Sequence, residues 1–184
     1  MFKGIIVAGA LAMSTLSIAC VASAQTSTNE RTRDLVAQLD KTKHKVKDKG
    51  NVHIELYTEV RNEAVVQSPA SLSGHYSSDV PGTYEMNLSV NSDGTATASG
   101  YDSVGLPNAV RTNYSFAGRL DGALLSGTRT YEDGRKEAFD AVFVRRTVRS
   151  GTSEKDATVT QTAFGVGYIL KGDNWNSRVF LEKQ

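Results

Sequence analysis

The fold of this 184-residue chain is decided by Tyr84-Glu-Met-Asn-Leu-Ser-Val-Asn-Ser-Asp-Gly-Thr-Ala-Thr-Ala-Ser-Gly100. Large apolar and polar side chains alternate from Tyr84 to Val90, which is the period of a strand with one buried face. Asp93-Gly94 then supplies the positive φ of a tight hairpin, and residues 95–100 return as the partner strand. The same Asp-Gly pair recurs at positions 121–122 and 133–134. The sequence therefore predicts an antiparallel meander.

Alternation and turn residues extend this pattern to the C-terminus. The predicted strands are Leu72–Tyr76, Tyr84–Val90, Thr95–Gly100, Arg111–Leu120, Ala123–Tyr131, Lys136–Thr147, Thr158–Leu170 and Trp175–Glu182. About eight strands is the number that closes a small up-and-down barrel. We therefore predict a mainly β fold, an up-and-down antiparallel β-barrel of about eight strands with an N-terminal α-helix, the barrel occupying residues 51–184. Residues 51–61 alternate as a strand does, but a continuing helix through Leu56 and Val60 fits them as well.

Residues 1–24 have the features of a secretory signal peptide. Lys3 precedes an apolar run of small residues, and Ala22-Ser-Ala24 matches the cleavage pattern before Gln25. Cleavage after Ala24 predicts a periplasmic or secreted protein. Cys20 offers a lipoprotein as the alternative, but the residues before it lack the leucine that such a site usually carries three places ahead.

Residues 25–50 are predicted to form a polar segment and a helix from Thr28 to about Val46. Its apolar stripe of Leu35, Val36 and Leu39 is narrow, so the helix must dock on another surface to be stable.

The outer wall of the barrel is the docking surface that the sequence favours. The strand 136–147 is apolar on both faces, and Gly165 and Gly167 make one side of the following strand flat. We expect the helix to lie against these two strands. A helix that plugs an open barrel end and a disordered tail are the alternatives.

Five lysines recur at every second position after residue 40. They are Lys41, Lys43, Lys45, Lys47 and Lys49. One interpretation is peripheral contact with an anionic surface, such as lipid headgroups or an acidic partner. The other is a solvated helix end, where lysines complement the negative pole of the helix dipole.

Composition excludes several classes of function. The single cysteine lies in the predicted signal peptide, so the mature chain has no disulfide, thiol nucleophile or cysteine metal site. The 21 basic and 20 acidic residues nearly cancel, which argues against nucleic-acid binding. His44, His53 and His75 follow no metal-ligand spacing, and no nucleophile or cofactor motif is present. We expect no catalytic residue, metal or cofactor.

Gly74-His-Tyr76 stands at the first predicted barrel strand, and Arg178 stands in the last. In these positions the chain resembles the lipocalin and calycin group, where Gly-x-Trp begins the first strand and an arginine packs across that aromatic ring. Tyr76 replaces the tryptophan, and the family's Thr-Asp-Tyr motif is absent. The resemblance implies a small barrel that binds an apolar ligand at its open end.

The predicted barrel interior is rich in aromatic rings. The predicted ligand-binding residues are Tyr84, Met86, Tyr114, Phe116, Phe139, Phe143 and Tyr168, and Phe164 and Phe180 are expected to point inward with them. The rings either line a pocket in which tyrosine hydroxyls orient a ligand, or simply fill the barrel. An eight-stranded interior is only just wide enough for its own side chains, which leaves both outcomes open.

Three hypotheses of function follow. The first is an exported non-enzymatic barrel that binds a small apolar ligand or an envelope protein. The second is a barrel-type enzyme, similar to a cyclase or isomerase, acting on a hydrophobic substrate with Tyr84, Tyr114 or Glu137 deep in the barrel. The third is a secreted protein inhibitor that uses the loop Asp102–Asn108 as its contact surface. A cavity of roughly several hundred Å³ would favour the first two hypotheses.

Overall fold

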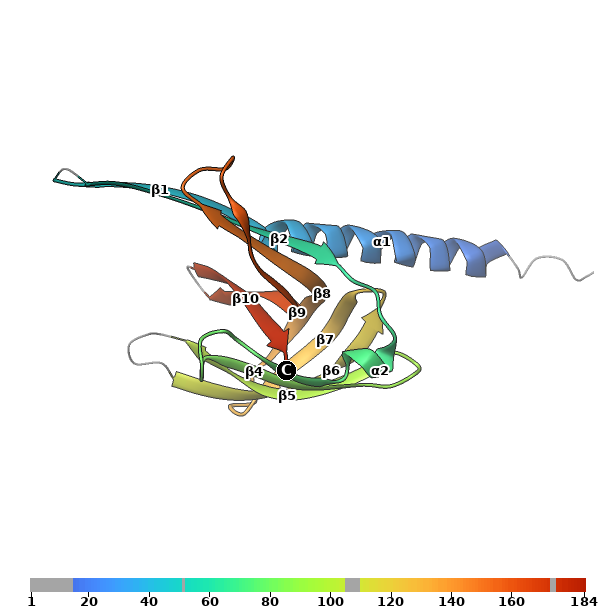
Figure 1. The fold of residues 1–184 in the computed structure, drawn as a ribbon. Helices are drawn as coiled ribbons and strands as arrows, with labels where there is room; N and C mark the ends of the chain where they lie inside the picture. The colour runs from blue at the N-terminus through green and yellow to red at the C-terminus, as the bar shows by residue number, and fades with distance from the viewer. Residues whose placement is uncertain (1–14, 51, 105–109, 173–174) are drawn as a thin grey trace, which may run out of the picture.

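A computed structural model describes residues 15–50, 52–104, 110–172 and 175–184 of the chain (Figure 1). Part of the predicted signal peptide, residues 1–14, lies outside this range, and of residues 15–26 only the helical backbone is described. The cleavage site at Ala24 and the lipoprotein alternative at Cys20 therefore stay predictions.

Eight antiparallel strands close a barrel, as the sequence predicts. They are β3 (Gly74–Ser77), β4 (Tyr84–Val90), β5 (Thr95–Val104), β6 (Val110–Asp121), β7 (Leu124–Tyr131), β8 (Lys136–Gly151), β9 (Thr158–Gly172) and β10 (Trp175–Lys183). Each strand pairs with the next along the chain. The last strand returns to the first, with Lys183 opposite Tyr76 and Glu182 opposite Ser77. The sheet thereby closes on itself in up-and-down order.

The hairpin between β4 and β5 confirms the predicted turn. Gly94 has a φ of 82°, a left-handed conformation that glycine adopts without steric cost. The Thr95 backbone N–H donates to the Asp93 carboxylate at 2.9 Å and fixes the turn from its other side. Gly122 and Gly134 have the same positive φ in the two later Asp-Gly turns. Local turn chemistry therefore sets the register of three hairpins.

Inward-facing side chains fill the barrel. The short helix α2 (Pro69–Leu72) leads into β3, and Leu72 is fully buried at one end of the core. Phe139 lies in a run of edge-to-face rings, with its centroid 5.5 Å from that of Phe116 and 5.1 Å from that of Tyr168. Each such contact adds about 0.5–1.5 kcal/mol to the effect of burial. Because the rings contact one another, a packed core describes the centre of the barrel better than an empty cavity.

Helix α1 (Thr15–Leu39) lies along the outside of the barrel (Figure 1). Leu35 and Leu39 are buried in a second apolar cluster, together with Ala123, Leu124, Val142 and Val144 of the barrel wall. A Cβ on Gly167 would lie 2.5 Å from the Leu39 side chain, so this glycine makes room for the helix. Burial of each leucine stabilises the docked helix by about 1.5–3 kcal/mol. The predicted docking on the outer wall is confirmed.

No helix in the described part of the chain is both long enough and apolar enough to cross a membrane.

The helix ends earlier than the sequence suggested. It was expected to reach Val46, but it ends at Leu39, and strand β1 (Lys41–Lys49) follows. β1 pairs along its whole length with β2 (Val52–Ala64), so residues 52–61 are strand and not helix. The physical reason is the alternation of the lysines, which has the period of a strand and gives a helix no apolar face after Leu39.

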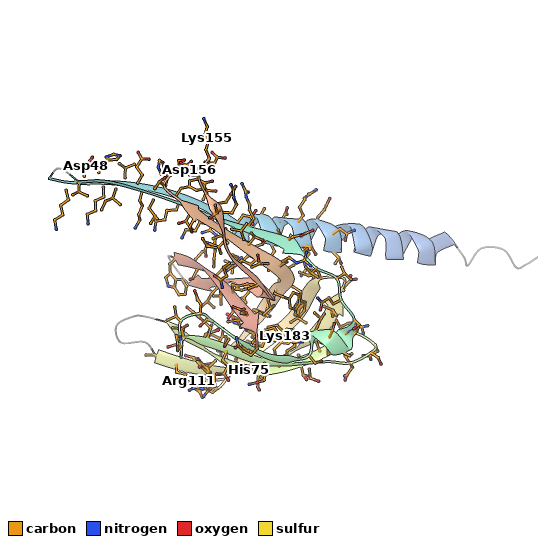
Figure 2. The ribbon with its side chains drawn as sticks, viewed as in Figure 1. Asp48, His75, Arg111, Lys155, Asp156 and Lys183 are labelled. Carbon is orange, nitrogen blue, oxygen red and sulfur yellow. The ribbon has the colours of Figure 1, made fainter. Side chains whose placement is uncertain are left out.

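The outer half of this hairpin projects beyond the barrel (Figures 1 and 2). Every residue of β1 is exposed, and β2 begins its pairing with β8 only at Tyr57, opposite Gly151. We call β1 together with residues 52–56 of β2 the arm. Figure 2 shows Asp48 at the far end of the arm, while His75 and Arg111 lie on the opposite side of the barrel. The arm therefore contributes no side chains to the barrel core.

Phe180 points out of the barrel and not into it. It packs with the cluster under α1, and the Arg146 guanidinium lies 3.9 Å from its ring centroid. Val179 and Leu181 on either side take the inward positions and are buried in the core. The expectation that Phe180 lines the interior is wrong, because one residue of phase moves a strand side chain to the other face. Phe164 does pack against the core, stacked on Phe143.

Arg178 does not cross the ring of Tyr76 as the resemblance implied. Its Nε donates to the Gln38 carbonyl at 2.5 Å, so Arg178 ties β10 to the end of α1 on the outer surface. The Lys183 ammonium instead lies 6.0 Å from the Tyr76 ring centroid and donates to the Ser71 carbonyl. A basic residue of the last strand thus still meets the first-strand aromatic, but it is a different residue.

Candidate functional site

The barrel wall separates between β8 and β9 at one end. β8 pairs with β7 as far as Lys136, but its pairing with β9 stops at Ala141, opposite Tyr168. β9 continues beside β10 to Gly172. Residues 136–140 of β8 and 169–172 of β9 therefore diverge, and a pocket of about 480 Å³ lies beside them. The barrel interior approaches the surface through its side at this point.

The pocket is formed by the helix on one side and by barrel residues on the other. Its lining includes Arg31, Asp34, Leu35 and Gln38 of α1, Arg129 of β7, Glu137, Phe139 and Asp140 of β8, and Ile169, Leu170 and Lys171 of β9. Arg31 Nη2 lies 2.5 and 2.6 Å from the two carboxylate oxygens of Asp140. Both side chains of this pair are nearly half exposed, so the ion pair contributes little to stability. Its effect is to hold α1 beside β8 at the edge of the pocket.

Arg129 lies at the inner end of the pocket with no exposed surface. Aromatic rings surround its guanidinium, whose Cζ is 3.7 Å from the centroid of Phe139, 4.1 Å from that of Tyr114 and 4.5 Å from that of Tyr168. A cation over ring faces is stabilised by about 2 kcal/mol or more when it is desolvated. The aromatic interior thus serves as a cage for one buried cation.

Asp102 is the counter-charge of Arg129. Arg129 Nη1 donates to its Oδ2 at 2.7 Å, and the carboxylate is 3% exposed. The Tyr168 hydroxyl donates to Oδ1 at 3.1 Å, and the Tyr131 hydroxyl lies 3.4 Å from Oδ2. Burial raises the pKa of Asp102, whereas Arg129 and the two tyrosine hydroxyls act to lower it. Both oxygens of Asp102 therefore accept a hydrogen bond, Oδ2 from Arg129 and Oδ1 from Tyr168.

Two of the three guanidinium nitrogens find no partner within the described part of the chain. Arg129 Nε and Nη2 are buried and have no hydrogen-bond acceptor among the described residues. These two nitrogens lie on one edge of the guanidinium and form the fork that receives two oxygens of a planar acid group. A buried donor left unpaired costs about 1–3 kcal/mol, and more when it belongs to a charged group. The site is thus organised to donate two further hydrogen bonds.

A second polar group lies beside the arginine. The Tyr131 hydroxyl donates to Glu137 Oε1 at 2.6 Å, and Glu137 is half-buried on the pocket lining. Burial raises the pKa of Tyr131 to about 12, with the Glu137 hydrogen bond acting in the same direction. Burial also raises the pKa of Tyr168 well above its ordinary value. At neutral pH the tyrosines are therefore neutral donors.

The predicted ligand-binding residues all lie in the barrel core or against it. Met86, Tyr114, Phe116, Phe139, Phe143 and Tyr168 are buried, and Tyr84 is partly buried at the edge of the same cluster. Three of them, Tyr114, Phe139 and Tyr168, surround Arg129. Met86, Phe116 and Phe143 pack elsewhere in the core, and none of them lines the pocket beside β8 and β9. Their role in ligand binding stays a prediction.

Sequence reasoning missed the central pair of the site. The predicted strand ends at Gly100 and Asp102 was expected in a loop, but β5 continues to Val104 and carries Asp102 into the barrel. Residues 105–109, which complete the loop predicted as an inhibitor contact, lie outside the described residues. A signal for Arg129 was present, because it shares the strand phase of the buried Leu125 and Tyr131. A charge at an inward position indicates a partner or a function.

Comparison with family models, with curated proteins and with solved structures finds no match for this chain. The inference of function therefore rests on the chemistry of the pocket.

Proposed function

We propose that this protein is an exported, non-enzymatic barrel that binds a small apolar molecule carrying a carboxylate. The observation behind the proposal is the pair of buried Arg129 nitrogens that have no acceptor in the described part of the chain. A ligand carboxylate on Nε and Nη2 would make a bidentate pair, which is stronger than a single neutral hydrogen bond. Asp102 occupies Nη1 and so holds the fork in place for that ligand.

The rest of the pocket suits the apolar part of such a ligand. Leu35, Phe139, Ile169 and Leu170 supply an apolar surface between the helix and the strands. The volume of about 480 Å³ lies within the usual range of small-molecule sites, about 300–1,000 Å³. Arg31 is paired with Asp140, and Lys171 offsets part of the negative charge of Asp34 and Glu137 on the same lining. The ligand would enter from the side of the barrel, beneath α1.

We also propose a place for the chain beside the lipocalin and calycin group. Support comes from the closed up-and-down barrel and from Tyr76, whose hydroxyl donates to the Leu72 carbonyl at 2.5 Å at the start of the first strand. The chain differs from that group in two respects: its pocket opens through the side of the barrel, and Arg178 lies on the outer surface.

A matched pair of ligands tests the carboxylate. A fluorescent long-chain fatty acid and its methyl ester differ only in the group that would meet Arg129. We expect the acid to bind about 10–100-fold more tightly, because a hydrogen bond to a charged group is worth about 1.5–3 kcal/mol. Equal affinity for acid and ester, or binding of neither, would contradict the proposal.

Variants place the preference on Arg129. Arg129→Gln together with Asp102→Asn removes both buried charges at once, which avoids leaving either one unpaired. This double variant should lose the preference for the acid. Arg111→Gln is the control, because Arg111 also stacks on a ring, 3.5 Å from the Tyr101 centroid, but on the exposed outer face. Circular dichroism and melting temperature establish that each variant is folded.

A barrel-type enzyme is the second candidate, and the Tyr131–Glu137 hydrogen bond favours it. A hydroxyl held at 2.6 Å from a carboxylate beside a pocket is the arrangement of a general acid–base pair. Such an enzyme would isomerise or cyclise a bound apolar acid. Mass spectrometry separates the candidates: a ligand recovered unchanged after long incubation supports binding, whereas a rearranged product that disappears with Tyr131→Phe supports catalysis.

A further inference from the structure

One face of the arm combines cations and exposed aliphatic side chains. Residues of β1 and β2 that are directly opposite share a face, and this register puts all five lysines of β1 on the same face as alternate residues of β2. The opposite pairs are Lys41 and Val60, Lys43 and Thr58, Lys45 and Leu56, Lys47 and Ile54, and Lys49 and Val52. The lysines therefore form one row and the aliphatic residues a second row beside it.

Acidic residues are kept off this face. Asp48 and Glu55 lie on the opposite face, where His53 Nδ1 is 2.5 Å from Asp48 and Nε2 is 3.0 Å from Glu55. None of the ion pairs among the described residues involves a lysine of the arm. The pKa of Lys43 is lowered, mainly by the neighbouring Lys45. The lysine row thus carries like-charge repulsion that the protein itself leaves uncompensated.

The aliphatic row is unusual for a protruding strand. Val52, Ile54 and Leu56 are 57%, 51% and 50% exposed. Lysines on an edge strand serve to prevent pairing with other chains, and this explains β1 by itself. It does not explain three exposed aliphatic residues on the neighbouring strand, which increase the risk of aggregation. A binding partner with an anionic outer layer and an apolar layer directly beneath it would explain both rows. The lysines would meet the anionic layer and the aliphatic side chains the apolar one.

We propose that the arm docks on the surface of an anionic phospholipid membrane. The lysines recur about every 7 Å along β1, given the rise of a strand, and can each approach a phosphate group. The aliphatic row would enter the boundary between headgroups and acyl chains, while the lysine stems follow it and keep their ammonium groups at the phosphates. An acidic protein or a nucleic acid would use the lysine row but would leave the aliphatic row in water. The lysines of β1 and the three aliphatic residues are all exposed, so no other element of the described chain covers this face.

Vesicle binding by the full chain tests the proposal. Vesicles of phosphatidylcholine alone are compared with vesicles in which phosphatidylglycerol replaces part of it. We expect at least about tenfold tighter binding to the anionic vesicles, falling as salt is added. The apolar N-terminal residues carry Lys3 as their one charged side chain, so most of the dependence on charge is expected to come from the arm.

Three lysines are then replaced at once. Lys45→Gln, Lys47→Gln and Lys49→Gln together should weaken binding to anionic vesicles about a hundredfold, since each lysine near such a surface contributes about a factor of five. The control removes the same charge elsewhere, through Lys136→Gln, Arg145→Gln and Lys155→Gln, all on exposed side chains. It should bind as the wild type does. Equal loss in both triple variants would show general electrostatics only and would overturn the docking role of the arm.

The aliphatic row has its own pair of variants. Ile54→Thr with Leu56→Thr keeps good strand formers and should weaken vesicle binding at least about fivefold. Val46→Thr, on the opposite face at 52% exposure, should leave it unchanged. If the Ile54 and Leu56 variant binds as the wild type does, or if a single-stranded oligonucleotide or polyglutamate competes fully for the arm, then the membrane is not its partner.

Discussion

Strands of the barrel and of the arm both alternate apolar and polar side chains, but the apolar side chains are buried in the barrel and exposed in the arm. Met86 and Leu88 on β4 are 0% and 5% exposed, whereas Ile54 and Leu56 on β2 are 51% and 50% exposed. Closure gives β4 an opposite wall to pack against, and the arm has none. Alternation thus predicts a strand, and topology decides whether its apolar face becomes core or surface.

Several charged side chains hold the junction between the two regions. Glu59 is 7% exposed and accepts from Arg61 Nε at 2.8 Å and from Arg149 Nη1 at 2.9 Å. The Asn62 backbone N–H donates to Asp40 Oδ1 at 2.8 Å, just after α1 ends. Arg61 and then Arg149 lower the pKa of Glu59, so these contacts stabilise the junction above the ordinary pKa of glutamate and are lost as the pH falls. The junction therefore depends on ion pairs and backbone pairing, whereas the barrel core depends on apolar packing.

The same substitution in the two regions gives the largest expected contrast. Leu125 is fully buried, and Leu125→Ala should lower the free energy of unfolding by about 2–5 kcal/mol through lost burial and the cavity left behind. Leu56→Ala removes the same atoms from the arm and should change it by less than about 0.5 kcal/mol. Urea unfolding followed by circular dichroism measures both values. A cost at Leu56 as large as that at Leu125 would show that the arm is part of the cooperative core.

The docked helix should behave as part of the barrel and not of the arm. Leu39 is 1% exposed, and Leu39→Asp places an unpaired charge against Gly167 and the apolar wall. We expect a loss of roughly 2–4 kcal/mol in the free energy of unfolding. Ala37→Asp adds the same charge on the exposed side of the helix and should cost less than about 1 kcal/mol. Equal melting temperatures for the two variants would mean that α1 is only tethered to the barrel.

Strand order and helix docking could be predicted from the sequence because each has a local signal. Alternation from Tyr84 to Val90 and the Asp-Gly turns determine the hairpins. Gly167 marks the flat part of the wall that receives Leu39 of the helix, whereas Phe180 and the β10 backbone lie over Gly165. The lysines from Lys41 to Lys49 also alternate, yet they were interpreted as a helix end. Their strand is recognised through its partner β2, because a strand whose side chains are all exposed has no buried face to reveal its period.

The candidate site could not be predicted in the same way. Arg129 and Asp102 come from different hairpins, and their contact depends on barrel closure. The pocket depends on where β8 stops pairing with β9, which no local pattern determines. The aromatic set was identified correctly as interior for Tyr114, Phe139 and Tyr168, but their function as a cage for a cation needed the inward phase of Arg129.

Two turn glycines give the finest comparison between the regions. Gly94 has a φ of 82°, and a Cβ there would lie 3.0 Å from the Leu120 carbonyl oxygen. Gly50, in the turn of the arm, has a φ of 61°, but a Cβ would meet no described atom within 4 Å. Gly94→Val should cost more than about 1 kcal/mol, because a β-branched residue resists positive φ and the turn belongs to the barrel.

Gly50→Val introduces the same conformational strain, but at the tip of a hairpin that can open locally. Local opening relieves the strain, so we expect the global free energy of unfolding to fall by less than about 0.5 kcal/mol. The melting temperature should then stay within about 1–2 °C of the wild type, because 1 kcal/mol shifts it by about 2–4 °C in a domain of this size. Amide hydrogen exchange should instead become faster along β1 and remain unchanged in β4 and β5. The contrary result is that Gly50→Val lowers the melting temperature as much as Gly94→Val does. The arm would then fold together with the barrel as one rigid body, and it would not open locally.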